Sequence, residues 1–219
     1  MNLSNLFEIQ RTLDYHIMDE HPEIRDQNNL DWKILALQVE IGECANEWRG
    51  FKKWSKDKEP RTFIRINCPD CLEKGFTPYN RPAQSEYYCK TCAGYLTIDT
   101  NPLLEEYVDG LHFVLSIGLE NYSWYNELLP VNQGLRKTDP IKYENTIKQF
   151  NYLFETLGYF MDCCLDHEIG TTSEVEEQYE NIVRMYLGLG EMLGFSWEQI
   201  EQAYMEKNAI NHQRQNEGY

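Results

Sequence analysis

Apolar residues recur at helical spacing over most of the chain, and this period is the feature that most limits how the chain can fold. It predicts six helices, at residues 3–18, 32–48, 103–122, 141–165, 175–193 and 197–210. Ser196 precedes the last of them, with Gln199 three residues on, which is typical of a capping box. A chain of 219 residues, 42% of them hydrophobic, can bury one sizeable core. The sequence therefore predicts an all-α helical bundle.

The helical period is absent between residues 60 and 100. This segment contains two CxxC pairs, Cys68 with Cys71 and Cys89 with Cys92, and 17 residues separate the pairs. Four thiolates at that spacing match a structural zinc site, which folds a segment too short to have its own core. A redox dithiol and an iron–sulfur site are the alternatives, although neither pair has the strand and helix context of a thioredoxin motif. We therefore expect an all-α catalytic domain at 1–59 and 101–219, with an inserted zinc-ribbon-like module at 60–100.

The balance of charges limits the partners of the chain. It has 36 acidic and 20 basic residues, a formal net charge of −16, which argues against binding to a nucleic-acid backbone. The insert is nearly neutral, so it favours packing or a protein partner over DNA. The start of the chain lacks a signal-peptide pattern, no stretch of about 18 apolar residues occurs, and the paired cysteines suit a reducing compartment. We expect a cytoplasmic protein that does not enter a membrane, in which Cys44, Cys163 and Cys164 are buried thiols.

Two of the predicted helices each carry a pair of acids three residues apart. Glu40 and Glu43 are flanked by apolar residues on both sides of their helix, and Glu106 and Asp109 form the second pair. If the two helices face each other, four carboxylates converge and repel one another unless a cation lies among them. Mg²⁺ suits such oxygen ligands, and it usually completes its shell with waters and phosphates. ExxE is also common on solvated helix faces, and a di-iron or di-manganese bundle is a rival, although it needs ExxH on two helices.

The strings EIGECANEWRGFKKW and EEYVDGLHF resemble the dimeric dUTPases, a family of the all-α NTP pyrophosphatase superfamily. Their signature is ExxE on one helix and ExxD on another, and four residues here match its metal ligands: Glu40, Glu43, Glu106 and Asp109. The resemblance implies a bundle of that type and a homodimer. It also implies hydrolysis of dUTP and dUDP with two or more Mg²⁺ ions, for which Mn²⁺ can substitute. The resemblance does not cover residues 60 to 100.

Further positions match the substrate contacts of that family. Gln10 matches a base-contacting glutamine, whereas Asp14 stands where we would expect an asparagine. His112 and Phe113 match a pair near the uracil and deoxyribose, and Trp54 matches a pocket aromatic. The family's polyphosphate contacts are matched by Lys207, Asn211 and Arg214. Their spacing places these three on one helix face, although a solvated polar C-terminal helix is the alternative explanation.

The implied reaction is attack of a metal-activated water on the phosphate chain, which yields dUMP and pyrophosphate from dUTP. We expect Glu43 to orient or deprotonate that water as well as to bind metal. Glu47 is expected to be a nearby polar group or an ion-pair partner instead of a ligand. Two alternatives stay open: an enzyme for another nucleotide such as dCTP, which the departure at Asp14 leaves open, and a catalytically silent protein that uses its zinc ribbon to hold a partner.

Overall fold

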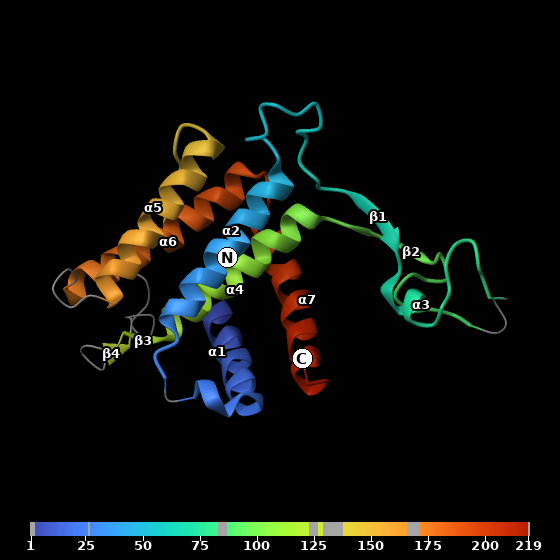
Figure 1. Cartoon of the computed structure of the whole chain (residues 1–219), viewed down its shortest axis with the longest axis horizontal. Coiled ribbons are helices and arrows are strands. Elements are labelled where there is room, and N and C mark those ends of the chain that lie inside the picture. The colour runs from blue at the N-terminus through green and yellow to red at the C-terminus, as the bar shows by residue number, and fades with distance from the viewer. Residues whose placement is uncertain are drawn as a thin grey trace.

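The computed structural model contains six long helices (Figure 1). It describes residues 3–25, 27–82, 87–122, 127–128, 138–165 and 171–218. The long helices are α1 (Leu3–Glu20), α2 (Leu30–Trp48), α4 (Pro102–Leu119), α5 (Thr146–Leu165), α6 (Thr172–Met192) and α7 (Trp197–Asn216). The short elements are the 3-10 helix η1 (Pro22–Ile24), α3 (Pro69–Glu73), and two antiparallel strand pairs, β1 (Ile64–Asn67) with β2 (Thr97–Thr100) and β3 (Asn121–Tyr122) with β4 (Glu127–Leu128). The predicted all-α class is confirmed, and none of the described helices is both long and apolar enough to cross a membrane.

α2 and α4 pack against each other in the middle of the bundle, with α5 and α6 paired beside them and α1 and α7 against α4 (Figure 1). Buried apolar residues from all six long helices form one core. Gly110 allows the helices to approach closely, because a Cβ there would lie 2.1 Å from the Tyr186 hydroxyl and 3.5 Å from the Cβ of Glu40. The Tyr186 hydroxyl donates to the carbonyl of Tyr107 at 2.7 Å. These contacts fix the part of α4 that carries the second acidic pair.

Several predicted helix bounds differ from the structure, and α7 continues to Asn216 instead of ending near residue 210, whereas the predicted N-cap of α7 is confirmed. α5 begins at Thr146 and not at 141, because the backbone N–H of Ile141 donates to the carbonyl of Arg184 at 2.9 Å, outside the helix. α4 ends at Leu119 and not at 122, where the chain enters β3. Ser196 is the N-cap of α7, and it shares the predicted reciprocal hydrogen bonds with the residue three positions on.

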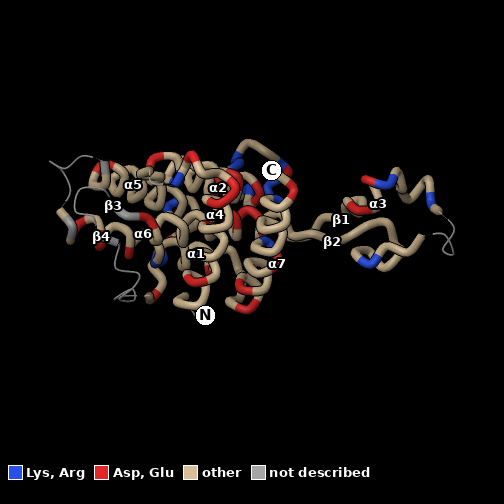
Figure 2. Tube along the Cα trace, turned by 90° about the horizontal axis from the view of Figure 1, so that it is seen from below, with Lys and Arg blue, Asp and Glu red and all other residues tan. Residues whose placement is uncertain are grey.

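The insert leaves the bundle after α2 and returns at the start of α4. β1 and β2 connect it to the helices, and Ile64 pairs with Thr100 where the strands meet the bundle. Both strands are rich in β-branched residues, which favour this conformation. Figure 2 shows the insert projecting away from the helices. Its base is held by the N–H of Arg61, which donates to the Glu47 carbonyl at 3.0 Å, and by the N–H of Leu103, which donates to the Arg61 carbonyl at 3.2 Å.

Candidate active site

Three of the four predicted metal ligands meet between α2 and α4. Carboxylate oxygens of Glu40, Glu106 and Asp109 all lie within 4.8 Å of one another. Glu43 is exposed and lies outside this group, but a hydrogen bond connects it to Glu106. The two acidic pairs therefore converge, as their spacing on two facing helices predicts.

Crowding and burial change the acidity of this group. Burial, then the charges of Asp109 and Glu43, raise the pKa of Glu40 from 4.5 to about 7. Burial is also the largest cause at Glu106, followed by the charge of Glu43, and it raises that pKa to about 7. Lys207 supplies one compensating charge, with its Nζ 2.5 Å from Asp109 Oδ2. Without a cation, these carboxylates retain protons near neutral pH. Together they form a set of hard oxygen donors, which fits Mg²⁺ or Mn²⁺.

A pocket of about 430 Å³ extends from these carboxylates between α1, α2, α4 and α7. Its volume is within the range of small-molecule sites. Glu40 and Asp109 lie on its wall, so the metal-binding group and the pocket form one site. The same wall contains six of the seven predicted substrate contacts: Gln10, His112, Phe113, Lys207, Asn211 and Arg214.

Trp54 is the predicted substrate contact that does not line this pocket. Its side chain is 78% exposed, and its ring meets Phe51 edge-on with 5.8 Å between centroids. Its role as a pocket aromatic stays a prediction. Trp32 of α2 lines the pocket, and its indole N–H donates to Asn29 Oδ1 at 2.9 Å. No motif marks Trp32, because its place on the wall depends on how α2 packs against α1 and α4.

The wall of the pocket also contains a buried polar network that the sequence analysis did not predict. Lys33 is 4% exposed and forms ion pairs with Glu120 and with Asp14, the latter at 3.7 Å. The Ser116 hydroxyl and the Gln10 amide nitrogen each donate to Asp14 at 2.7 Å. The signal that could have revealed this network is a lysine near the buried face of an otherwise apolar helix.

His112 belongs to the same network on the pocket wall. Its ring stacks on Tyr204 with 4.1 Å between centroids, and its Nδ1 lies 2.8 Å from Gln10 Oε1. The Tyr204 hydroxyl donates to the same Gln10 oxygen at 2.7 Å. Burial, and then the charge of Lys207, lower the pKa of His112 to about 3. The imidazole is therefore neutral at physiological pH.

The last acidic residue of α2, Glu47, has a structural partner. Glu47 accepts from the Arg61 guanidinium at 3.0 and 3.3 Å, which ties the end of α2 to the start of the insert. The predicted ion-pair role of Glu47 is confirmed. The three cysteines outside the insert are buried as predicted, namely Cys44, Cys163 and Cys164.

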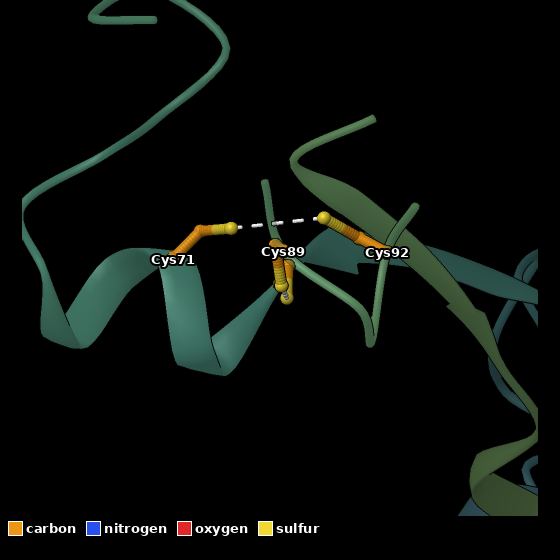
Figure 3. A group of neighbouring side chains, drawn as sticks. Cys71, Cys89 and Cys92 are labelled. Atoms are coloured by element: carbon orange, nitrogen blue, oxygen red, sulfur yellow. Dashed lines mark hydrogen bonds between the residues drawn. The ribbon is translucent and has the colours of Figure 1, made fainter. Parts of the chain in front are cut away.

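The four cysteines of the insert converge at one point, and Figure 3 shows three of them, Cys71, Cys89 and Cys92. The sulfur atoms of Cys68 and Cys89 are 3.7 Å apart, and those of Cys71 and Cys92 are 3.6 Å apart. Disulfide-bonded sulfurs would lie about 2.05 Å apart. A tetrahedron with zinc–sulfur bonds of about 2.3 Å has sulfur–sulfur edges of about 3.8 Å. The geometry of the four thiols therefore fits zinc.

The pKa values of three of these thiols are shifted in different directions. A backbone hydrogen bond from Cys92 lowers the pKa of Cys89 to about 6. Burial raises the pKa of Cys68 and of Cys71. Four thiols so close together cannot all lose their protons without a cation. Full deprotonation of this donor set therefore needs a soft divalent metal.

The comparisons with known proteins point to one family. The family model described as dUTPase matches residues 2–73 and 94–219, a range that includes every predicted metal and substrate residue of the bundle. Residues 74–93, which contain Cys89 and Cys92, lie outside the match. Neither curated proteins nor solved structures yielded a match. The chain belongs to the dUTPase family of the dimeric all-α type, whose members hydrolyse dUTP and dUDP to dUMP.

Proposed function

We propose that the pocket between α1, α2, α4 and α7 is where the chain hydrolyses dUTP to dUMP and pyrophosphate, and dUDP to dUMP and phosphate. One observation carries this assignment. Three carboxylates from two helices converge within 4.8 Å, and two of them, Glu40 and Asp109, line a pocket that also contains two cationic side chains of α7, Lys207 and Arg214. An acidic protein that binds a polyphosphate needs both features, because the carboxylates alone would repel the substrate.

Glu40, Glu106 and Asp109 are the residues that would hold Mg²⁺, or Mn²⁺ in its place, with Glu43 beside them. Bound there, the ions neutralise charge on the phosphates and lower the pKa of a coordinated water. The raised pKa values of Glu40 and Glu106 support this role, since a cation would offset both the burial of the charged carboxylates, which is the larger cause, and their mutual repulsion.

Glu43 is the candidate general base. It is exposed and outside the tight group of three, so it can accept a proton from the attacking water. The water oxygen bonds to phosphorus, the bond from phosphorus to the leaving phosphate oxygen breaks, and the leaving group takes the electron pair. Lys207, Asn211 and Arg214 lie where they can donate to the phosphate oxygens.

Zinc at Cys68, Cys71, Cys89 and Cys92 would be structural. Few other side chains are buried in the part of the insert that the structure describes, so sulfur ligation would organise its fold. Closely packed thiols that hold zinc fit a reducing compartment such as the cytoplasm. A protein partner for the insert stays a prediction.

A homodimer is supported by apolar side chains on the central helix α2. Leu35 is 60% exposed and Val39 is 49% exposed, and these residues are one helical turn apart. Contact with a second copy would remove this stripe from water. Light scattering after gel filtration tests this proposal, and a monomer at micromolar concentration would contradict it.

Release of pyrophosphate or phosphate should be measured from dUTP, dUDP, dCTP, dTTP and dATP with Mg²⁺, with Mn²⁺ and with EDTA. We expect metal-dependent turnover of dUTP and dUDP only. Glu106→Gln should remove it, whereas Glu155→Gln, the same change at an exposed position on α5, should not. Turnover in EDTA, or equal turnover of dCTP, would contradict the assignment.

A further inference from the structure

Hydrogen bonds connect a buried ion pair on the wall of the pocket to His112 on the same wall. Lys33 faces Asp14 at 3.7 Å, and Asp14 accepts from the Ser116 hydroxyl and from Gln10 Nε2, each at 2.7 Å. The other end of the Gln10 amide, Oε1, lies 2.8 Å from Nδ1 of His112. The path therefore runs from a lysine on α2, through α1, to a histidine of α4 that lines the pocket.

The pair of Lys33 and Asp14 sets the direction of these hydrogen bonds. A carboxylate only accepts hydrogen bonds, and Lys33 only donates them. Gln10 must therefore turn its NH₂ group toward Asp14 and its oxygen toward His112. An oxygen only accepts, so Nδ1 of His112 must carry the proton. The Tyr204 hydroxyl can donate or accept, so it adapts to the orientation of the Gln10 amide and does not determine it.

The proton on Nδ1 determines the role of the second ring nitrogen of His112, Nε2. A neutral imidazole has one proton, so Nε2 is left as an acceptor. Among the described residues, Nε2 is buried and has no hydrogen-bond partner. A buried polar atom without a partner in a pocket wall requires an explanation, and a bound ligand is one.

We propose that Asp14, held by Lys33 and Ser116, is a positioning residue that makes His112 a hydrogen-bond acceptor for the uracil N3–H of the substrate. The choice of N3–H rests on the proposed function. A hydroxyl of the sugar can donate or accept, so it does not need an acceptor of fixed direction. N3–H is the donor of fixed direction in uracil, and cytosine has an acceptor at the same ring position. The network would thus favour dUTP over dCTP.

Asparagine at position 14 would lose this direction. Its side chain has one accepting and one donating end, so its NH₂ could face Gln10 and reverse the amide. His112 would then accept at Nδ1 and carry its proton on Nε2. The carboxylate of Asp14 is therefore the part of the network that matters, and Lys33 is its matched cation.

The tautomer can be measured directly. Long-range ¹H–¹⁵N correlation spectra of the full-length protein distinguish Nδ1–H from Nε2–H imidazoles. The His112 signals among the five histidines can be assigned with His112→Asn. We expect Nδ1–H in the native protein and a shift toward Nε2–H in Asp14→Asn. Asp19→Asn makes the same change at an exposed site on α1 and should leave the tautomer as it is. Nε2–H in the native protein, or no change in Asp14→Asn, would overturn the proposal.

Kinetics test the link to the substrate. We expect Asp14→Asn to raise KM for dUTP by about tenfold or more with kcat nearly unchanged, because the lost contact is present in both ground and transition states. The preference for dUTP over dCTP should fall by a similar factor. A loss of kcat alone, or an unchanged preference, would refute the role in specificity. If the native protein hydrolyses neither nucleotide, the proposed function fails, while the spectra still decide whether Asp14 sets the tautomer.

Discussion

The bundle and the insert are stabilised in different ways. The bundle has a core to which all six long helices contribute, and its polar groups are arranged around that core. Among the described residues of the insert, the buried cluster consists of the four cysteines and Leu96. Hydrophobic burial can therefore fold the bundle, but the insert has too little apolar surface for this.

The same comparison applies to the two candidate metal sites. In the bundle, half-buried carboxylates lie on helices that other residues hold in place, so the site can exist before metal binds. In the insert, the ligands are themselves the core, so metal binding and folding are one event. On the proposed function, metal would serve chemistry in the bundle and stability in the insert.

Removal of zinc should have the largest effect. Structural zinc contributes about 10–16 kcal/mol in small zinc modules, so Cys71→Ser should unfold the insert and leave the bundle folded. Amide exchange should show loss of protection at residues 64–100, while helical circular dichroism is retained. The control is Cys163→Ser, a buried cysteine of α5, which should leave the insert protected. Joint unfolding of both regions in Cys71→Ser would contradict the comparison.

Lys33→Met should have the largest effect on the bundle. It leaves Asp14 and Glu120 buried without their cation, which costs about 3–5 kcal/mol. Urea denaturation of the zinc-bound protein should show this loss in the helical transition. Lys148→Met removes a surface pair with Glu144, whose side chains are 46% and 66% exposed, and should change stability by less than about 0.5 kcal/mol. Equal effects of the two variants would show that Lys33 is not buried as described.

Glu43→Gln should separate chemistry from stability. The fold, the zinc content and the melting temperature should be retained, because Glu43 is exposed. Turnover of dUTP should fall by about 10²–10³-fold or more, since the variant cannot accept a proton from water. Glu155→Gln, with the same charge change on α5, should keep full activity. Near-normal turnover in Glu43→Gln would remove this residue from the mechanism.

Much of the fold follows from local patterns, and the errors fall where local patterns compete with tertiary contacts. Apolar periodicity located all six long helices, because each has a stripe that must be buried. It placed the start of α5 at residue 141 because Ile141 fits that period, but the backbone of Ile141 bonds to α6 instead. Periodicity reports on which side chains are buried, and it says nothing about where the adjacent backbone groups are bonded.

The site was predictable to the extent that it lies in short motifs. Two acidic pairs at i and i+3 were enough to place Glu40 and Glu106 together. Lys33 and Trp32 required knowledge of which helices meet, which no single segment contains. Gln10 was expected to contact the base, yet both ends of its amide are bonded within the protein. Residue type and place were predictable there, but the direction of its hydrogen bonds was not.

The smallest predicted effect is on the pH dependence of stability, which should have opposite signs in the bundle and in the insert. Glu40 and Glu106 have a pKa of about 7 in the folded protein, above their ordinary 4.5. Between pH 5 and 7 the native state therefore binds protons that the unfolded state lacks, so without Mg²⁺ the bundle loses stability as pH rises through this window. Both groups are half exposed, and solvent screening reduces the effect to about 1–2 kcal/mol.

The insert should respond in the opposite direction, because protons compete with zinc for the thiolates, so acid weakens it. Thermal melts from pH 5 to 8 without Mg²⁺ should be compared between the native protein and Glu40→Gln, which cancels contributions from other carboxylates. The difference between them should change with pH in the helical transition and not in the protection of the insert. Added Mg²⁺ should reduce it, because a cation at the carboxylates returns their pKa values toward the ordinary range. A pH dependence of the same sign in both regions would contradict the raised pKa values of Glu40 and Glu106 in the metal-free bundle.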